Sequence, residues 1–158
     1  MAVPSPYRSL PVARRVALLT HDITHSRESR SSYVTRVVSG GGGFRPETLK
    51  KWPPEQLARE IVRRGLETLH DEAALLQLLY VELEPQLQID FLDGAGVPHE
   101  KGVIPEDLQA PCADAATVRR SAEALIAKHG EDGRTYLRTI AVYNGEAWPG
   151  LAEMFSER

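Results

Sequence analysis

Cysteine is almost absent from this 158-residue sequence, which contains only Cys112. A single cysteine excludes an intrachain disulfide and a cysteine metal cluster, and it fits a reducing compartment. The most apolar stretch becomes too polar beyond Glu82 to supply the ~20 consecutive apolar residues that a membrane-spanning helix needs. An apolar signal-peptide region is also missing, because prolines interrupt the opening residues MAVPSPYRSLP. We therefore expect a cytoplasmic protein that does not enter a membrane.

A recognisable catalytic or cofactor signature is missing as well. Cys112 stands just before a predicted helix with no base paired to it in the sequence. Glycines 40–43 lead into a helix, as a phosphate-binding loop does, but the Lys-Ser/Thr of such a loop does not follow them. The sequence therefore favours a non-catalytic protein without a cofactor.

Charge is divided unevenly along the chain, although the net charge is only −3. Residues 1–70 contain 12 Lys and Arg against 6 Asp and Glu, whereas residues 71–158 contain 7 against 16. The basic and acidic halves attract each other, either within one chain or head to tail between copies. The alternative is that the basic half meets a separate acidic partner.

The largest apolar block lies in residues 53–94 and predicts two core helices. Residues 53–69 carry apolar side chains at the spacing of an amphipathic helix, with Pro53 and Pro54 suited to its first turn. Residues 71–92 predict a helix that is buried nearly all round, with Asp71 as N-cap and a kink near Val81 caused by Pro85. A short strand containing Leu87 and Phe91 is the alternative for the second part of this helix.

Helical periodicity also marks most of the remaining chain. The further helices are predicted over residues 12–23, 27–38, 115–129 and 132–143, with short helices near 46–52 and 151–155. Residues 34–38 are rich in β-branched side chains and would also suit a strand. We predict an all-α protein, an irregular bundle of six or seven helices, in which residues 1–39 form a basic helical arm, glycines 40–43 a hinge and residues 44–158 the body.

A cluster of potential metal ligands lies in the segment THDITH. His21, Asp22 and His25 place two imidazoles and a carboxylate within five residues, a ligand set suited to a divalent transition metal. The segment ALLTHDITH resembles the His-Asp motif of the HD-domain phosphohydrolases, which are all-helical. The resemblance covers about ten residues, and it implies a metal-dependent hydrolase in which the second pair, His70 and Asp71, would join the site. No histidine precedes His21 to supply the upstream ligand of that family.

Arginines of the predicted arm are the candidate binding residues. Those that we select are Arg14, Arg15, Arg27, Arg30 and Arg36. They give the arm the electrostatic character of a nucleic-acid-binding segment, but no known nucleic-acid-binding motif accompanies them and the acidic half opposes a polyanion. We therefore expect a helical interaction or assembly module that binds a protein partner or itself through the arm. A metal-dependent hydrolase and a nucleic-acid-associated protein are the alternatives.

Overall fold

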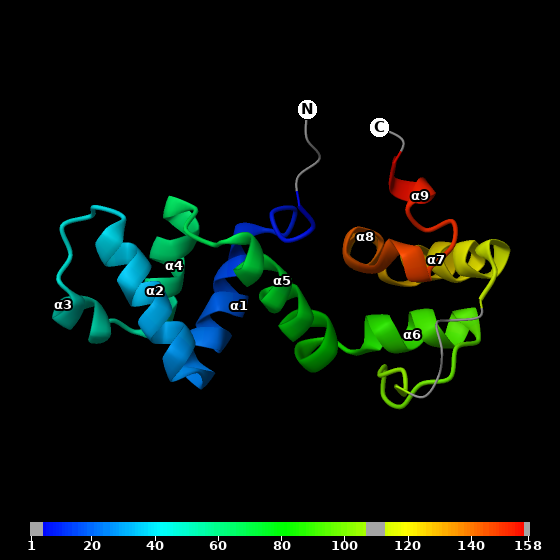
Figure 1. Cartoon of the computed structure of the whole chain (residues 1–158), viewed down its shortest axis with the longest axis horizontal. Helices are drawn as coiled ribbons and strands as arrows, with labels where there is room; N and C mark the ends of the chain where they lie inside the picture. The colour runs from blue at the N-terminus through cyan, green and yellow to red at the C-terminus, as the bar shows by residue number, and fades with distance from the viewer. Residues whose placement is uncertain (1–4, 107–112, 157–158) are drawn as a thin grey trace. The chain divides into compact units, whose positions relative to one another are not determined.

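The computed structural model describes residues 5–106 and 113–156 of the chain (Figure 1). Helices make up most of these residues, and no strand occurs among them beyond one isolated bridge between Glu100 and Val103. The predicted all-α class is therefore confirmed. Cys112 lies outside the described residues.

The described helices follow one another through short connections, except between α6 and α7, which residues 96–114 separate. The α-helices are α1 (Val12–His25), α2 (Arg27–Ser39), α3 (Pro46–Lys50), α4 (Pro54–Arg64), α5 (Leu69–Gln77), α6 (Gln86–Ala95), α7 (Ala115–His129), α8 (Glu131–Asn144) and α9 (Glu153–Ser156). A π-helical turn, η1 (Leu78–Leu83), follows α5, and a 3-10 turn, η2 (Gly145–Ala147), follows α8. Residues 27–38 and 86–95 are helical, so the two strand alternatives are wrong.

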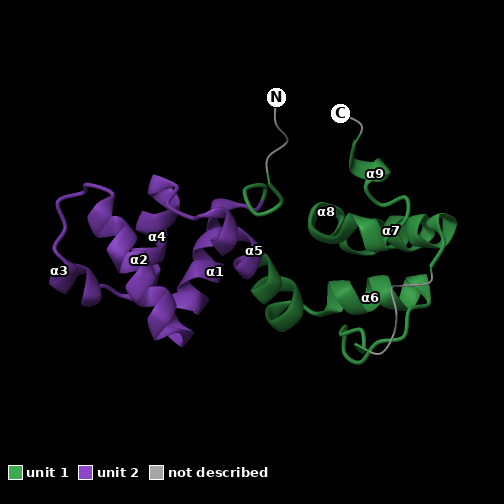
Figure 2. Cartoon of the chain, in the orientation of Figure 1, with its two compact units in different colours: residues 1–9, 76–158 green, residues 10–75 purple. Residues whose placement is uncertain are grey.

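The chain forms two compact units (Figure 2). Unit 2 comprises residues 10–75, and unit 1 comprises residues 1–9 and 76–158. Within unit 2, α1 packs on α4 and α2, and α2 also contacts α3. The helices of the predicted arm therefore share a core with the helices that follow the glycines. The division into an arm of residues 1–39, a hinge of residues 40–43 and a body of residues 44–158 stays a prediction.

Local sequence signals place the helices of unit 2. Ser26 caps α2, because its side chain accepts a hydrogen bond of 3.1 Å from the backbone N–H of Ser29. Pro54 occupies the first turn of α4, and Gly65 ends this helix in the left-handed conformation at φ 63°. Between these ends, α4 buries Leu57 and Ile61 completely. The unit 2 core is therefore built from one face of each amphipathic helix.

Unit 1 is built on the contacts of α6 with α7 and of α7 with α8. Phe91 of α6 lies against Trp148 with ring centroids 4.9 Å apart, and Tyr136 of α8 stacks edge-on with Tyr80 at 5.1 Å. A Cβ atom added to Gly94 would lie 2.3 Å from the Ser121 hydroxyl oxygen. Glycine at this position therefore permits close packing of α6 on α7.

The prediction of one buried α-helix over residues 71–92 is wrong in two respects: part of the segment is a π-turn, and the helix is interrupted at Pro85. The backbone widens into η1, where Glu84 N–H donates to the Leu79 carbonyl at 2.6 Å, and Pro85 then separates η1 from α6. A π-turn holds more residues per turn than an α-helix, so some of the residues within it leave the buried face. Val81 and Leu83 are consequently 41% and 40% exposed. The sequence predicts a kink here, whereas the structure shows a complete interruption.

Leu79 provides a test of the core at this interruption, because its side chain is buried while that of Val81 is not. We expect Leu79→Ala to lower the free energy of unfolding by about 2 to 5 kcal/mol through lost burial and a cavity. Val81→Ala is the matched control and should cost less than about 1 kcal/mol. Urea denaturation of both variants measures the difference, and equal costs would contradict the described η1 geometry.

A group of hydrogen bonds around one carboxylate, that of Asp90, joins α6 to the end of α7. Asp90 accepts hydrogen bonds from Gln86 at 2.7 Å, Lys128 at 2.9 Å and His129 at 2.8 Å. Burial of the Asp90 carboxyl opposes its ionisation, but the hydrogen bonds from His129, Lys128 and Gln86 outweigh this effect and lower its pKa to about 2. The ionised carboxylate therefore stabilises the folded state.

The contribution of Asp90 to the free energy of unfolding should depend on pH. Its pKa is lower in the folded state than the usual 3.8, so the contribution is full above about pH 4 and is lost as the pH falls toward about 2. We expect Asp90→Asn to be less stable than the wild type at pH 6, with a difference that shrinks between about pH 4 and pH 2. Denaturant titrations across this range measure it, and a constant difference would show that Asp90 does not titrate as described.

Candidate interaction groove

A groove runs between α1 and α4 on unit 2. It has a volume of about 540 Å³, and we call it the α1–α4 groove. Its lining consists of Val12, Ala13, Arg15, Val16, Glu55, Arg59, Val62 and Arg63. Val12 is 57% exposed, although valine normally contributes to a core. The groove is thus an open apolar surface at the seam of two packed helices.

The helical period explains how charged and apolar side chains share this groove. Leu57, Ala58 and Ile61 form the buried face of α4, so Glu55, Arg59 and Arg63 lie on its outer side. On α1, Leu18, Leu19 and Ile23 are buried, whereas the first turns present Val12 and Val16 beside Arg15. Apolar side chains therefore come mostly from α1, and arginines mostly from α4.

The arginines of the groove already have carboxylate neighbours. Arg59 contacts Glu55 at 2.5 Å on the surface of α4, whereas Arg63 contacts Glu60 at 2.5 Å, and the Glu60 side chain is mostly buried and also pairs with Arg64. An exposed pair at helical spacing, such as that of Arg59 with Glu55, contributes only about 0.3 to 0.5 kcal/mol. The Arg59 guanidinium can therefore turn to an incoming carboxylate at little cost.

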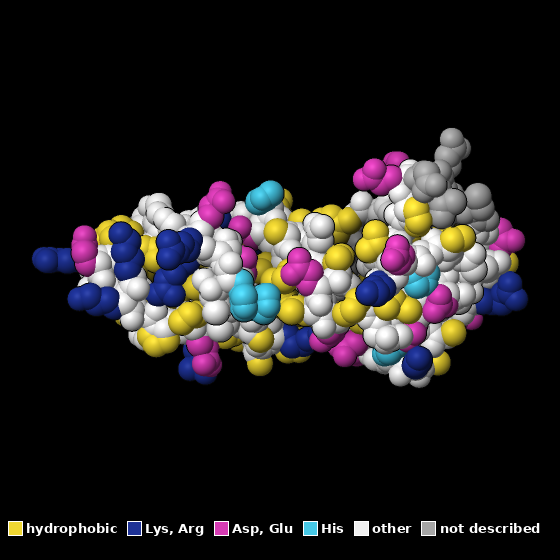
Figure 3. Space-filling model, turned by 90° about the horizontal axis from the view of Figure 1, so that it is seen from below, with side chains coloured by type: hydrophobic (Ala, Val, Ile, Leu, Met, Phe, Trp, Pro, Cys, Tyr) yellow, Lys and Arg dark blue, Asp and Glu magenta, His cyan; other side chains and the backbone are white. Residues whose placement is uncertain are grey.

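Arg15 is held more firmly at one side of the groove. Its guanidinium lies 3.7 Å from the carboxylate of Glu67, which is buried. Unit 2 as a whole contains 11 Lys and Arg against 8 Asp and Glu. On the face drawn in Figure 3, Lys and Arg side chains gather over unit 2. Both the groove and its surroundings are therefore positive.

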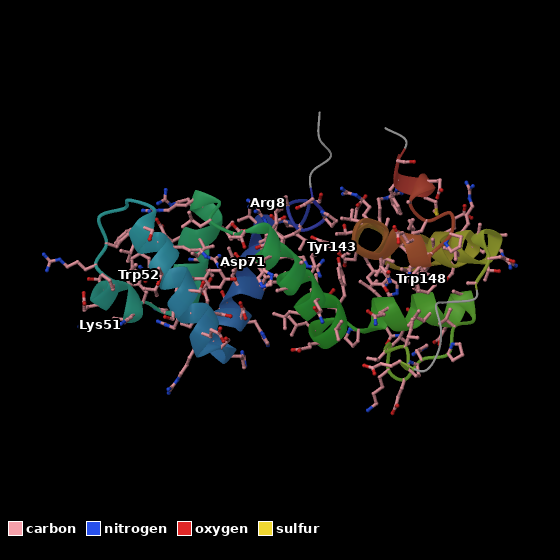
Figure 4. The ribbon with its side chains drawn as sticks, in the orientation of Figure 1. Arg8, Lys51, Trp52, Asp71, Tyr143 and Trp148 are labelled. Carbon is pink, nitrogen blue, oxygen red and sulfur yellow. The ribbon has the colours of Figure 1, made fainter. Side chains whose placement is uncertain are left out.

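A polar network lies elsewhere in unit 2, between α2 and the start of α5. Asp71, labelled in Figure 4, lies in the first turn of α5. Arg36 pairs with Asp71 through both carboxylate oxygens, and Asp71 also accepts from the Thr68 N–H at 2.7 Å. Thr68 in turn accepts from the Asp71 N–H at 3.2 Å. This reciprocal pattern is a capping box, so the predicted N-cap role of Asp71 is wrong and Thr68 caps the helix.

The network changes the acidity of two of its members. Burial of Asp71 opposes its ionisation, but hydrogen bonds from Arg36 and Thr68 outweigh this and hold its pKa below the usual range. Burial of Tyr33, with further repulsion from Asp71 and Asp22, raises the pKa of its hydroxyl. Tyr33 therefore stays protonated and Asp71 ionised at neutral pH.

Three of the five arginines proposed as binding residues make contacts inside unit 2. Arg15 pairs with Glu67 and Arg36 with Asp71, while Arg30 donates to the carbonyl oxygens of Lys50 at 2.9 Å and Trp52 at 2.6 Å. Arg15 also lines the groove. Arg27 is exposed on α2, and Arg14 is half-buried on α1. The binding role of the five stays a prediction.

The predicted metal ligands do not converge. His21 and His25 stack on α1 with ring centroids 4.2 Å apart. Asp22 instead faces α2, where it accepts from the hydroxyls of Ser29 at 3.1 Å and Tyr33 at 3.4 Å. Over residues 5–106 and 113–156, no three His, Cys, Asp or Glu side chains gather as a metal ion would require. The arrangement does not fit the ligand set expected from the sequence, and the metal hypothesis itself stays a prediction.

The second His-Asp pair is also separated. His70 is exposed at the start of α5, whereas Asp71 is buried against Arg36. Adjacent residues of a helix point about 100° apart, which explains why only one of them reaches the network.

Sequence reasoning missed the contribution of α4 to the groove. It treated the helix containing Val62 only as part of the core and gave Glu55, Arg59 and Arg63 no binding role. Two separate signals were available in the sequence, namely the charged outer face of α4 and the apolar residues in the first turns of α1. Periodicity reveals such faces on each helix, but it does not reveal which two helices will lie side by side.

Comparison with protein-family models, with curated proteins and with solved structures found no match. Within the described part of the chain, no helix combines the length and the apolar character needed to cross a bilayer. The function must therefore be argued from the groove itself.

The Arg36–Asp71 pair can be tested with a double-mutant cycle. Asp71→Ala should lower the free energy of unfolding by about 1 to 3 kcal/mol, because Arg36 and the Thr68 N–H lose a buried acceptor. Adding Arg36→Ala to this variant should cost less than Arg36→Ala costs in the wild type, since the two side chains interact directly. Thermal or urea unfolding of the four proteins measures the coupling, and strictly additive effects would contradict the pair.

Proposed function

We propose that this chain is a non-catalytic helical interaction module, and that the α1–α4 groove binds an amphipathic helical segment bearing acidic residues. One observation carries the proposal, namely the exposed apolar strip of α1 lying beside the arginines of α4. A helix that docks in a groove offers apolar side chains at i, i+3, i+4 and i+7. Its flanking carboxylates would meet Arg59 and Arg63.

The chemistry of the groove favours binding over reaction. Its described lining has one carboxylate, Glu55, and no histidine, cysteine, serine or threonine. A nucleophile with an adjacent base, which covalent catalysis requires, is therefore not provided by these eight residues. Arginine is well suited to a partner surface, because its planar guanidinium can hold a carboxylate through two hydrogen bonds. The proposal includes the cytoplasmic location that we expect from the sequence.

A defined peptide tests the groove without knowledge of the natural partner. The probe is a designed helical peptide with Leu at i, i+3, i+4 and i+7 and Glu at the flanking positions, and the control peptide carries Lys in place of Glu. We expect the purified full chain to bind the acidic peptide and not the basic one. Fluorescence anisotropy of the labelled peptides measures this.

Two matched variants locate the binding. Val12→Asp should lower the affinity for the acidic peptide by at least about tenfold, equivalent to ~1.4 kcal/mol, because it places a carboxylate on the apolar strip. Val142→Asp is the control, since Val142 is a similarly exposed valine of unit 1 at 62%. Circular dichroism confirms that both variants stay folded. Equal loss of affinity in both, or no binding by the wild type, would refute the groove as the site.

A further inference from the structure

Unit 1 carries an exposed acidic and apolar strip at η1. We define the η1 ridge as Val81, Glu82, Leu83 and Glu84. Val81 and Leu83 are each about two-fifths exposed, and the Glu82 side chain between them is exposed as well. The π-turn produces this arrangement, because it moves an apolar sequence off the buried face of its helix. Such turns occur often at functional sites.

The surroundings of the η1 ridge add negative charge. A hollow of about 460 Å³ lies beside it, and its lining includes Leu83, Glu84, His129 and Asp132. Unit 1 as a whole contains 8 Lys and Arg against 14 Asp and Glu. Exposed apolar side chains flanked by carboxylates are the chemistry that the α1–α4 groove would bind.

We infer that the α1–α4 groove of one copy of this chain receives the η1 ridge of a second copy, so that the protein assembles head to tail. Val81 would lie against Val12, Val16 and Val62, with Leu83 at the edge of the contact, because residues two apart in a helical turn do not share a face. Glu82 would meet the exposed guanidinium of Arg63, or that of Arg59 in place of the weak surface pair that Arg59 now makes with Glu55. The inference rests on the proposed function and names the partner.

Charge supports a second copy as the occupant. Unit 2 has a net charge of +3 and unit 1 a net charge of −6, so two copies attract each other when unlike units meet. The two surfaces are different, and the contact is therefore heterologous. A heterologous contact leaves one groove and one ridge unused at the ends, and it extends to a chain or closes to a ring.

Two variants that each lose one surface provide a sharp test. The groove variant is Arg59→Glu with Arg63→Glu, and the ridge variant is Val81→Lys with Glu82→Lys. Light scattering after size exclusion gives the mass of each full-length protein, and circular dichroism verifies that each is folded. Val142→Lys with Glu146→Lys is the matched control, because both residues are exposed in unit 1 away from η1.

We expect the wild type and the control to exceed the monomer mass of 17.5 kDa increasingly with concentration. Each surface variant alone should be a monomer, since it has lost one of the two surfaces. Their equimolar mixture should form a dimer of about 35 kDa and nothing larger, because one intact groove meets one intact ridge. Raising the salt from about 0.1 M to about 1 M should lower the mass of the wild type by screening the charges.

The results also separate this inference from the proposed function. A wild type that stays monomeric while it still binds the acidic peptide would overturn self-assembly and leave the groove as a site for another protein. A mixture that stays monomeric, or one that grows beyond a dimer, would overturn the head-to-tail contact. Loss of both peptide binding and assembly in the wild type would overturn both proposals.

Discussion

Pro85 has no backbone N–H, and this single missing donor decides how the most apolar part of the chain is used. A helix cannot continue through it without losing a hydrogen bond and meeting a steric clash, so α6 begins only at Gln86. The preceding turn relaxes to π geometry, with Glu84 bonded to Leu79. Leu79 and Tyr80 remain in the core, whereas Val81 and Leu83 reach the surface. Buried and exposed apolar side chains thus follow one another within η1.

Arginine has two different roles in unit 2. Arg36 is tied to a buried carboxylate and to the start of α5, where leaving the carboxylate without its partner would be costly. Arg59 and Arg63 are instead exposed and pair with carboxylates of their own helix, Glu55 and Glu60. The fully exposed pair of Arg59 with Glu55 adds little to stability. The positive charge of unit 2 is therefore partly structural and partly presented to the outside.

Much of the fold could be predicted from the sequence, because helix signals are local. The caps at Ser26 and Asp114 and the break at Pro85 depend on residues within a few positions of each other. The capping box of Thr68 and Asp71 is a local signal that was missed, whereas the pairing of Asp71 with Arg36 could not be predicted, because the two residues are 35 positions apart. The candidate groove was missed for the same reason, since it exists only where α1 and α4 lie side by side. The function proposed from charge division survives as a proposal, now with a specific surface.

The close contact of Gly94 with Ser121 has an effect beyond packing. The Ser121 hydroxyl donates to the Phe91 carbonyl at 2.8 Å, while Gly94 leaves room for the serine side chain. Together they prevent α6 from sliding along α7, because a shift of even one residue would bring a Cβ atom against the serine. The Ser121 hydroxyl therefore fixes α6, the helix that follows the η1 ridge, through a bond to Phe91 that spans 30 residues of the chain.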